Sequence, residues 1–193
     1  MEFPNQNCML VVAGANGSGK STLAFELQKR YEIKFINADV IAKELDPSNT
    51  TGGELNAGRI FFKEINNCFQ NSESFILEST LSGKYTKRLF QRAIENGYTI
   101  KIIYIYLEDP ELCILRIKER VEKGGHFVPD EAVIRRYFRS AQNFWNDYKT
   151  DSHEWFMVHN SNLGFKEFCL GTHENYQILD KVKFNEFIKK GSL

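Results

Sequence analysis

The segment Leu10–Leu23 constrains the fold of this chain more than any other, because it contains the complete pattern G-x-x-x-x-G-K-[ST]. The pattern occupies Gly14–Ser21, an apolar run over 9–12 precedes it, and a helix-compatible run over 21–31 follows it. A buried strand, a glycine-rich loop and a helix in this order form the phosphate-binding loop of nucleotide-binding α/β proteins. We therefore predict an α/β fold in which this unit binds the phosphates of a nucleotide.

The residue types of the loop suit a triphosphate. Its three glycines let backbone N–H groups turn inward and approach the phosphate oxygens closely. The helix that begins near Lys20 directs its positive end at these phosphates, the Lys20 ammonium reaches the β- and γ-phosphates, and the Ser21 hydroxyl is placed to ligate Mg²⁺. An ordinary glycine-rich turn is the alternative, and the full match with both flanks favours nucleotide binding over it. The predicted nucleotide contacts are Gly14, Ala15, Asn16, Gly17, Ser18, Gly19, Lys20, Ser21 and Thr22.

Length and charge limit the classes of protein and partner. A chain of 193 residues predicts a single domain over 1–193. Lys+Arg and Asp+Glu both number 25, so no overall field attracts nucleic acid or an anionic membrane. No apolar run approaches the length of a membrane span. We therefore expect the partners to be a nucleotide and a small molecule, with no nucleic acid and no membrane.

Cysteine usage and the first residues of the chain bear on its location. Cys8, Cys68, Cys113 and Cys169 are scattered, and no C-x-x-C pair occurs, so we expect free thiols in a reducing compartment. The stretch before the first strand lacks a basic region typical of a secretory signal. These features predict a cytoplasmic protein.

Hydrophobic periodicity predicts strands that alternate with helices, and hence a mostly parallel sheet with helices on both faces, as in P-loop NTPases. The segment 164–176 is compatible with a hairpin or a loop, and a final helix is predicted from about 184. We assign no function to the C-terminal segment 164–193. Strands are predicted over 8–13, 34–37, 74–77, 99–107 and, as the last, 155–158; helices are predicted over 21–31, 40–45, 54–69, 84–96, 110–123 and 130–148.

Phosphoryl transfer also needs a group that activates the acceptor. Asp39 follows the second predicted strand, at the edge where ligands bind in open α/β sheets, and suits a general base. An N-cap of the helix that starts at Val40 is an equally open interpretation. Glu78 ends the third predicted strand and suits Mg²⁺ coordination or contact with the acceptor, whereas an ordinary solvated glutamate is the alternative. Thr80 suits substrate binding or a plain turn.

Arginines gather on the two helices on either side of a Gly-Gly-His break. Such a pair of basic helices suits a helical lid over about 116–139 that closes on the phosphates. The alternative is a solvated face on which Glu119, Glu122 and Glu131 pair with the arginines. The arginines concerned are Arg116, Arg120, Arg135, Arg136 and Arg139.

Several stretches together resemble the zeta-toxin-like P-loop kinases. Besides the phosphate loop, they are INAD (Ile36–Asp39), AGR (Ala57–Arg59), LESTLSGK (Leu77–Lys84) and RIKERVEKGGHFVPDEAVIRRYFRS (Arg116–Ser140). The order and spacing of these stretches extend over most of the chain. The resemblance implies an ATP- or GTP-dependent kinase that uses Mg²⁺ and phosphorylates a hydroxyl group of a small molecule.

In the toxins of that family the acceptor is UDP-N-acetylglucosamine, and an antitoxin protein is the partner. The resemblance implies that Asp39 is the catalytic base, that Glu78 and Thr80 contact the acceptor, and that the lid arginines fall among Arg116, Arg120, Arg135 and Arg136 without a one-to-one match. We assign Lys20, Arg116, Arg120 and Arg136 to the transferred group and Arg135 to the acceptor. The family also has chromosomal members with no known antitoxin, which the GGHFVP lid of this chain resembles more closely. An ATPase or switch without an acceptor is the alternative function.

Overall fold

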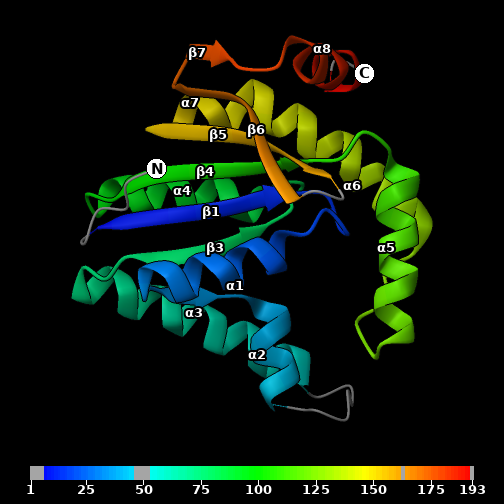
Figure 1. The fold of residues 1–193 in the computed structure, drawn as a ribbon. Helices are drawn as coiled ribbons and strands as arrows, with labels where there is room; N and C mark the ends of the chain where they lie inside the picture. The colour runs from blue at the N-terminus through cyan, green and yellow to red at the C-terminus, as the bar shows by residue number, and fades with distance from the viewer. Residues whose placement is uncertain (1–6, 46–52, 162–163, 192–193) are drawn as a thin grey trace.

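The computed structural model describes residues 7–45, 53–161 and 164–191. A seven-stranded sheet in the order β2-β3-β1-β4-β5-β6-β7 forms the centre, with helices packed against it (Figure 1). The strands are β1 Cys8–Gly14, β2 Lys34–Ile36, β3 Phe75–Ser79, β4 Thr99–Tyr106, β5 Glu154–Ser161, β6 Gly164–Thr172 and β7 Asn175–Ile178. The helices are α1 Lys20–Tyr31, α2 Ala38–Leu45, α3 Gly53–Asn71, α4 Lys84–Glu95, α5 Pro110–Glu122, α6 Asp130–Asn143, the π-helical turn η1 Phe144–Tyr148, α7 Lys149–Asp151 and α8 Lys181–Gly191.

The first five strands are parallel, and β1 lies between β3 and β4. The C-terminal ends of these strands therefore meet at one edge of the sheet, which is where ligands bind in open α/β folds. This arrangement confirms the predicted mostly parallel sheet of a P-loop kinase-like α/β fold. The segments that directly follow β1, β2 and β3 carry Lys20 at the start of α1, Asp39 at the start of α2, and Thr80, and the structure thus brings these residues to the same edge.

Alternate residues of β1 pack into two cores on the two faces of the sheet. Met9 and Val11 belong to a large apolar cluster that includes residues of α3, α4, α5, α6 and α8. Leu10 and Val12 belong to a smaller cluster that α1 covers, with Phe165 of β6 packed against it. Helices therefore cover both faces, as predicted.

The C-terminal part differs from the expectation. The strand predicted as the last one is longer, and β6 and β7 follow it in antiparallel order, so strands do not alternate with helices to the end. The connection between β5 and β6 is too short for a parallel crossover, which needs a dozen or more residues, and so the chain reverses directly. Of the two alternatives for 164–176, the hairpin is confirmed.

The helix predicted over 130–148 is also interrupted. It leaves regular α-helical geometry after Asn143, and the π-helical turn that follows inserts one more residue per turn than an α-helix would. Phe144 and Tyr148, the first and last residues of this turn, both have buried side chains. Apolar periodicity alone does not signal this local widening.

Three further observations concern the start of α5, the cysteines and the length and polarity of the helices. The Asp109 carboxylate accepts a hydrogen bond of 2.9 Å from the backbone N–H of Glu111 and so caps α5, whose first residue is Pro110. All four cysteines are free, as predicted, and all four are buried. Within the described ranges, every helix is too short or too polar to span a lipid bilayer.

Candidate functional site

The phosphate-binding loop connects β1 to α1 in close contact with its neighbours. Gly14, Gly17 and Gly19 all adopt positive φ angles, of 141°, 81° and 98°. A Cβ atom at Gly14 would lie 2.5 Å from the Ile105 carbonyl oxygen, and one at Gly17 would collide with the Cys113 carbonyl. Glycine is therefore required at these positions both for backbone conformation and for space, which leaves the loop free to curve around a ligand.

Lys20 is buried beneath this loop, with an exposed fraction of 5%. Its Nζ donates a hydrogen bond of 2.8 Å to the Ala15 carbonyl and lies 3.7 Å from a carboxylate oxygen of Glu78. Burial lowers the pKa of the Lys20 ammonium, and the Glu78 carboxylate only partly opposes this effect. A bound polyanion would stabilise the charged form, because it would add the opposite charge that the buried ammonium lacks.

The loop also holds a polar atom without a partner. The Ser18 side chain is fully buried, and within the described part of the chain its hydroxyl oxygen has no hydrogen-bond partner. Buried hydroxyl groups are normally hydrogen-bonded, and exceptions concentrate at functional sites. This observation, with the glycine contacts above, fits a loop built to receive acceptor oxygens of a ligand.

Glu78, at the end of β3, is the centre of a small polar network. One of its carboxylate oxygens accepts a hydrogen bond of 2.8 Å from the Ser21 hydroxyl and one of 2.6 Å from the Asn37 side-chain amide. Because Ser21 donates its hydrogen to Glu78, the lone pairs of its oxygen stay available to a cation. A hydroxyl and a carboxylate are hard oxygen ligands, and this set fits Mg²⁺ held together with nucleotide phosphates.

A metal held by protein side chains alone is a different case. Among the residues that the structure describes, no group of three or more His, Cys, Asp or Glu side chains could hold a metal ion. Mg²⁺ in phosphoryl-transfer enzymes is usually bound through one or two protein groups plus substrate phosphates, so the Ser21–Glu78 pair suffices for that mode.

Asp39 lies in the first turn of α2, and one of the two interpretations of this residue is wrong. Asn37, not Asp39, caps the helix, because its side-chain oxygen accepts hydrogen bonds from the backbone N–H groups of Asp39 and Val40, at 2.7 and 3.4 Å. The Asp39 side chain is exposed, and its charge acts on the pKa of Lys20. In the described ranges its carboxylate has no hydrogen-bond or ion-pair partner, which leaves it available to a substrate.

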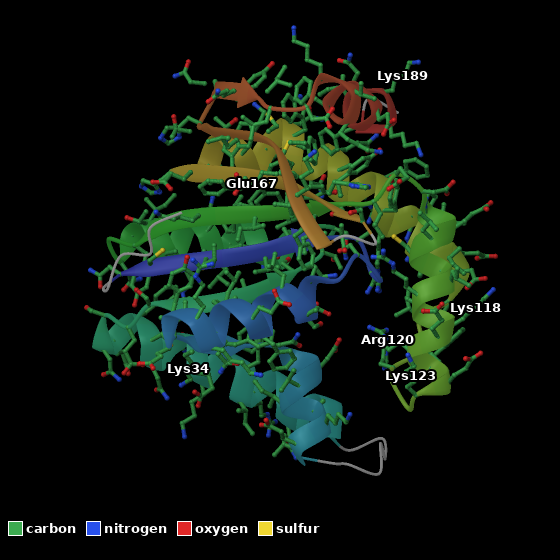
Figure 2. The ribbon with its side chains drawn as sticks, viewed as in Figure 1. Lys34, Lys118, Arg120, Lys123, Glu167 and Lys189 are labelled. Carbon is green, nitrogen blue, oxygen red and sulfur yellow. The ribbon has the colours of Figure 1, made fainter. Side chains whose placement is uncertain are left out.

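Three of the five arginines contact the phosphate loop or its surroundings. Arg136 donates to the Asn16 side chain at 3.3 Å, and Arg116 donates to the Asn160 carbonyl at 3.4 Å. Arg120 projects from α5 on the side that faces the rest of the molecule, whereas Lys118 points to the opposite side (Figure 2), and the Arg120 charge acts on the pKa of Lys20. These contacts are consistent with the predicted helical lid.

Arg135, Arg139 and Thr80 make no hydrogen bond to the phosphate loop within the described part of the chain. Arg135 and Arg139 are exposed on α6, and the Thr80 hydroxyl shares a hydrogen bond of 2.7 Å with the Ser82 hydroxyl. The alternative of a paired surface does not apply, because no ion pair among the described residues links any of the five arginines to Glu119, Glu122 or Glu131. A substrate role for Arg135 and Thr80 stays a prediction.

The Gly-Gly-His break holds the side chain of Arg120. The Arg120 guanidinium donates a hydrogen bond of 2.6 Å to the His126 carbonyl, and the Gly125 N–H donates one of 2.9 Å to the Arg120 carbonyl. A Cβ atom at Gly125 would lie 2.5 Å from Arg120 Cγ and 2.8 Å from the Arg120 carbonyl oxygen. The second glycine of the break therefore gives the arginine side chain its space.

Replacement of Gly125 by alanine is expected to displace the Arg120 guanidinium and to lower kcat for phosphoryl transfer by about 10²-fold, the scale of a misplacement near 1 Å. The measurement is steady-state kinetics with the melting temperature recorded in parallel. Gly124→Ala is the control, because Gly124 has a φ of 79° but open space around its Cβ position, so it strains the same loop without touching Arg120. Equal losses of kcat in both variants would contradict the role of Gly125.

Two contributing residues were missed in the sequence. Asn37 was expected only as the end of a strand, although an Asn directly before the first residue of a helix is a common cap. Asn160 follows a strand whose end was placed too early, and its side chain donates a hydrogen bond of 2.8 Å to the Ser18 carbonyl of the phosphate loop. No local pattern signals a contact between segments so distant in the chain.

Comparisons with known proteins agree with this geometry. A family model described as Zeta toxin matches residues 2–153. A Haemophilus influenzae protein, described as uncharacterized, is 36% identical over 132 residues, which cover 68% of this chain and 94% of that protein. The family-model match includes the phosphate loop, Asp39 and the arginines of α5 and α6 as sequence, and neither match states a substrate.

Solved structures share the fold. A chain of the AvrRxo1-ORF1:-ORF2 complex superposes with a TM-score of 0.73 at 13% identity over 94% of this chain, and that complex was also solved with ATP. This chain spans 63% of the length of that chain. A chain of the PezAT chromosomal toxin–antitoxin system of Streptococcus pneumoniae gives a TM-score of 0.63 at 17% identity, covering 81% of this chain and 68% of that one. At these identities the likeness concerns the fold.

Proposed function

Because the chain belongs to the zeta toxin family, whose P-loop kinase fold it has, we propose that it transfers the γ-phosphate of ATP or GTP to a hydroxyl group of a small molecule. One observation carries the proposal: Asn37 caps the turn that presents Asp39 and also binds Glu78, which in turn contacts Ser21 and Lys20 of the phosphate loop. A single side chain thus connects the candidate base to the candidate nucleotide site.

The triphosphate binds in the phosphate loop. Backbone N–H groups around the three glycines and the N-terminus of α1 bind its oxygens, and the Lys20 ammonium lies against the β- and γ-phosphates. The burial of Lys20 and its lowered pKa support this role, since a charge kept out of water gains most from an anionic ligand. ATP and GTP are both compatible with these contacts, because they concern the phosphates and not the base.

Mg²⁺ would be held by Ser21, directly, and by Glu78, directly or through water. When bound, it supplies positive charge to the phosphate oxygens. The hydrogen bond from Ser21 to Glu78 supports this assignment. It directs the hydroxyl hydrogen at the carboxylate, and so leaves the lone pairs of the Ser21 oxygen available to the cation.

Asp39 activates the acceptor. Its carboxylate takes the proton of the acceptor hydroxyl while the hydroxyl oxygen forms a bond to the γ-phosphorus. The bond between the γ-phosphorus and the oxygen that bridges it to the β-phosphate breaks, and the diphosphate leaves with that oxygen. The lack of a bonding partner for Asp39 within the described chain supports this role, since a base must be free to accept a proton.

The arginines of α5 and α6 offset the charge that spreads over the transferred group. Arg116, Arg120 and Arg136 are the candidates. Arg136 contacts the phosphate loop at Asn16, the Arg120 charge acts on Lys20, and Arg116 contacts Asn160, whose side chain is bonded to the loop. Arg135, Thr80 and Glu78 remain the proposed contacts of the acceptor. A UDP-amino sugar is the first acceptor to test, on the strength of the family alone.

The proposal is tested by incubation of the protein with γ-labelled ATP or GTP, Mg²⁺ and a panel of UDP-sugars, nucleosides and small alcohols. We expect label to appear in one acceptor class, and the Asp39→Asn variant to show no label above background. Release of labelled inorganic phosphate without a labelled product, from both proteins alike, would instead indicate an ATPase or switch and would refute the kinase.

A toxin role is a separate proposal, because family membership alone favours it. Growth arrest on expression of the wild type, absent with Asp39→Asn and relieved by a co-expressed antitoxin, would support it. An active kinase that does not affect growth would remove the toxin role and leave the chemistry in place.

A further inference from the structure

Asn160 lies at the end of β5, beyond the residues 2–153 that match the family model. Its side-chain amide donates a hydrogen bond of 2.8 Å to the Ser18 carbonyl, and Phe165, its partner on β6, lies near the same loop. A Cβ atom built at Gly19 would be 3.6 Å from the Phe165 ring and would collide with the Asn160 amide. The hairpin formed by β5 and β6, here called the C-terminal hairpin, is therefore packed directly against the phosphate loop.

The hydrogen bond to Ser18 fixes the orientation of one peptide group. A trans peptide is planar, and its C=O and N–H point in opposite directions. Asn160 holds the Ser18 carbonyl toward β5, so the Gly19 N–H of the same peptide is directed away from β5. Gly19 is also the N-cap of α1, with a φ of 98°. Because glycine has few steric limits on its backbone dihedral angles, a hydrogen bond to the preceding carbonyl helps to keep this peptide in one orientation.

Asn160 also contacts the lid. Its backbone carbonyl accepts a hydrogen bond of 3.4 Å from the Arg116 guanidinium on α5. The residue therefore touches the phosphate loop with its side chain and a candidate phosphate-binding arginine with its main chain. Its side chain is partly buried, which limits competition from water.

We propose that Asn160 is a positioning residue of the nucleotide site, which directs the Gly19 N–H at the phosphates by holding the Ser18 carbonyl. The inference rests on the proposed nucleotide binding and extends the site to the C-terminal hairpin. Asn160 does not touch the reacting atoms, and its effect passes through the loop.

The test compares Asn160→Ala with the wild type by calorimetric titration of Mg·ATP and, separately, of inorganic tripolyphosphate with Mg²⁺. We expect the Kd of both ligands to rise by about tenfold, the equivalent of one hydrogen bond, while kcat at saturating ATP stays within about threefold. Asn160→Asp is expected to bind more weakly than Asn160→Ala, because it removes the donor and adds a negative charge near the phosphates.

Asn96→Ala is the matched control. The Asn96 amide makes the same kind of bond, 2.7 Å to the Arg92 carbonyl at the end of α4, and its loss should leave both Kd values unchanged. If Asn160→Ala lost affinity for Mg·ATP but not for tripolyphosphate, Asn160 would contact the base or sugar, and the inference would be overturned. A lower melting temperature with unchanged Kd would make Asn160 merely structural.

The two proposals fail differently. If wild-type protein binds Mg·ATP but labels no acceptor, the kinase is refuted while the effect of Asn160 on binding still stands. If Asn160→Ala binds as tightly as the wild type and both label an acceptor, the inference on Asn160 is refuted alone. Absence of binding by the wild type would overturn both.

Discussion

Replacement of Asp39 by asparagine is expected to lower the turnover number for phosphoryl transfer by about 10²- to 10⁴-fold, the contribution of a general base. Asparagine keeps the shape of the side chain but cannot accept a proton from the acceptor hydroxyl. The Asn37 cap binds the backbone N–H of residue 39, so the substitution leaves the turn in place. The Kd of Mg·ATP should therefore stay close to that of the wild type.

Single-turnover kinetics with labelled ATP measure the transfer step, and calorimetry measures the binding of Mg·ATP. Glu44→Gln is the matched control, because Glu44 is a second exposed carboxylate on α2, further along the helix, and its replacement removes the same charge. If Asp39→Asn turned over at the rate of the wild type, Asp39 would not be the base, although nucleotide binding would be unaffected by that result.

Replacement of Lys20 by methionine is expected to raise the Kd of Mg·ATP by about 100-fold, because the ligand loses charge-assisted hydrogen bonds to a buried ammonium. Titration calorimetry checks this value. Lys149→Met is the matched control. Lys149 is equally buried, with an ion pair to Glu174 and an ammonium 4.9 Å from the centre of the Trp145 ring, but it lies on α7 and makes no contact with the phosphate loop. Its replacement should leave the Kd unchanged.

Lys20→Met should weaken Mg·ATP binding without lowering the stability of the nucleotide-free protein. The pKa of Lys20 is lowered in the folded protein, so between that value and its ordinary pKa the unfolded chain binds more protons. Stability from this group therefore rises with pH through that window, and below it the buried charge is a cost. Lys20→Met removes the cost and should melt no lower than the wild type at neutral pH in a nucleotide-free thermal scan. A much lower melting temperature would mean that the Lys20–Glu78 pair holds the fold together.

The sequence predicted the centre of the molecule well. The phosphate loop is a local motif whose glycines determine backbone shape, and the apolar run over 102–106 of β4 favours a buried strand. The cap at Asp109 was predictable too, because the following Pro110 marks the first helical position. In each case the deciding interactions lie within a few residues of one another along the chain.

The rest depended on interactions that a local pattern does not contain. Asn37 and Asp39 are both good capping residues, and the choice depends on where the strand ends and the helix begins. β7 is only four residues long and mostly exposed, so the sequence left a loop open as the alternative to its pairing with β6. Asn160 of β5 and Arg116 of α5 come into contact only in the folded protein.

The position of Asn160 has a consequence for how the protein matures on the ribosome. The chain emerges in order, so the phosphate loop is synthesised early, yet the amide that holds it arrives 142 positions after Ser18. A nascent chain that has not yet released β5 contains the full motif without its support. If Asn160 supports the loop as proposed, chains that end before β5 are expected to bind nucleotide more weakly than chains that include it, although they contain the whole motif.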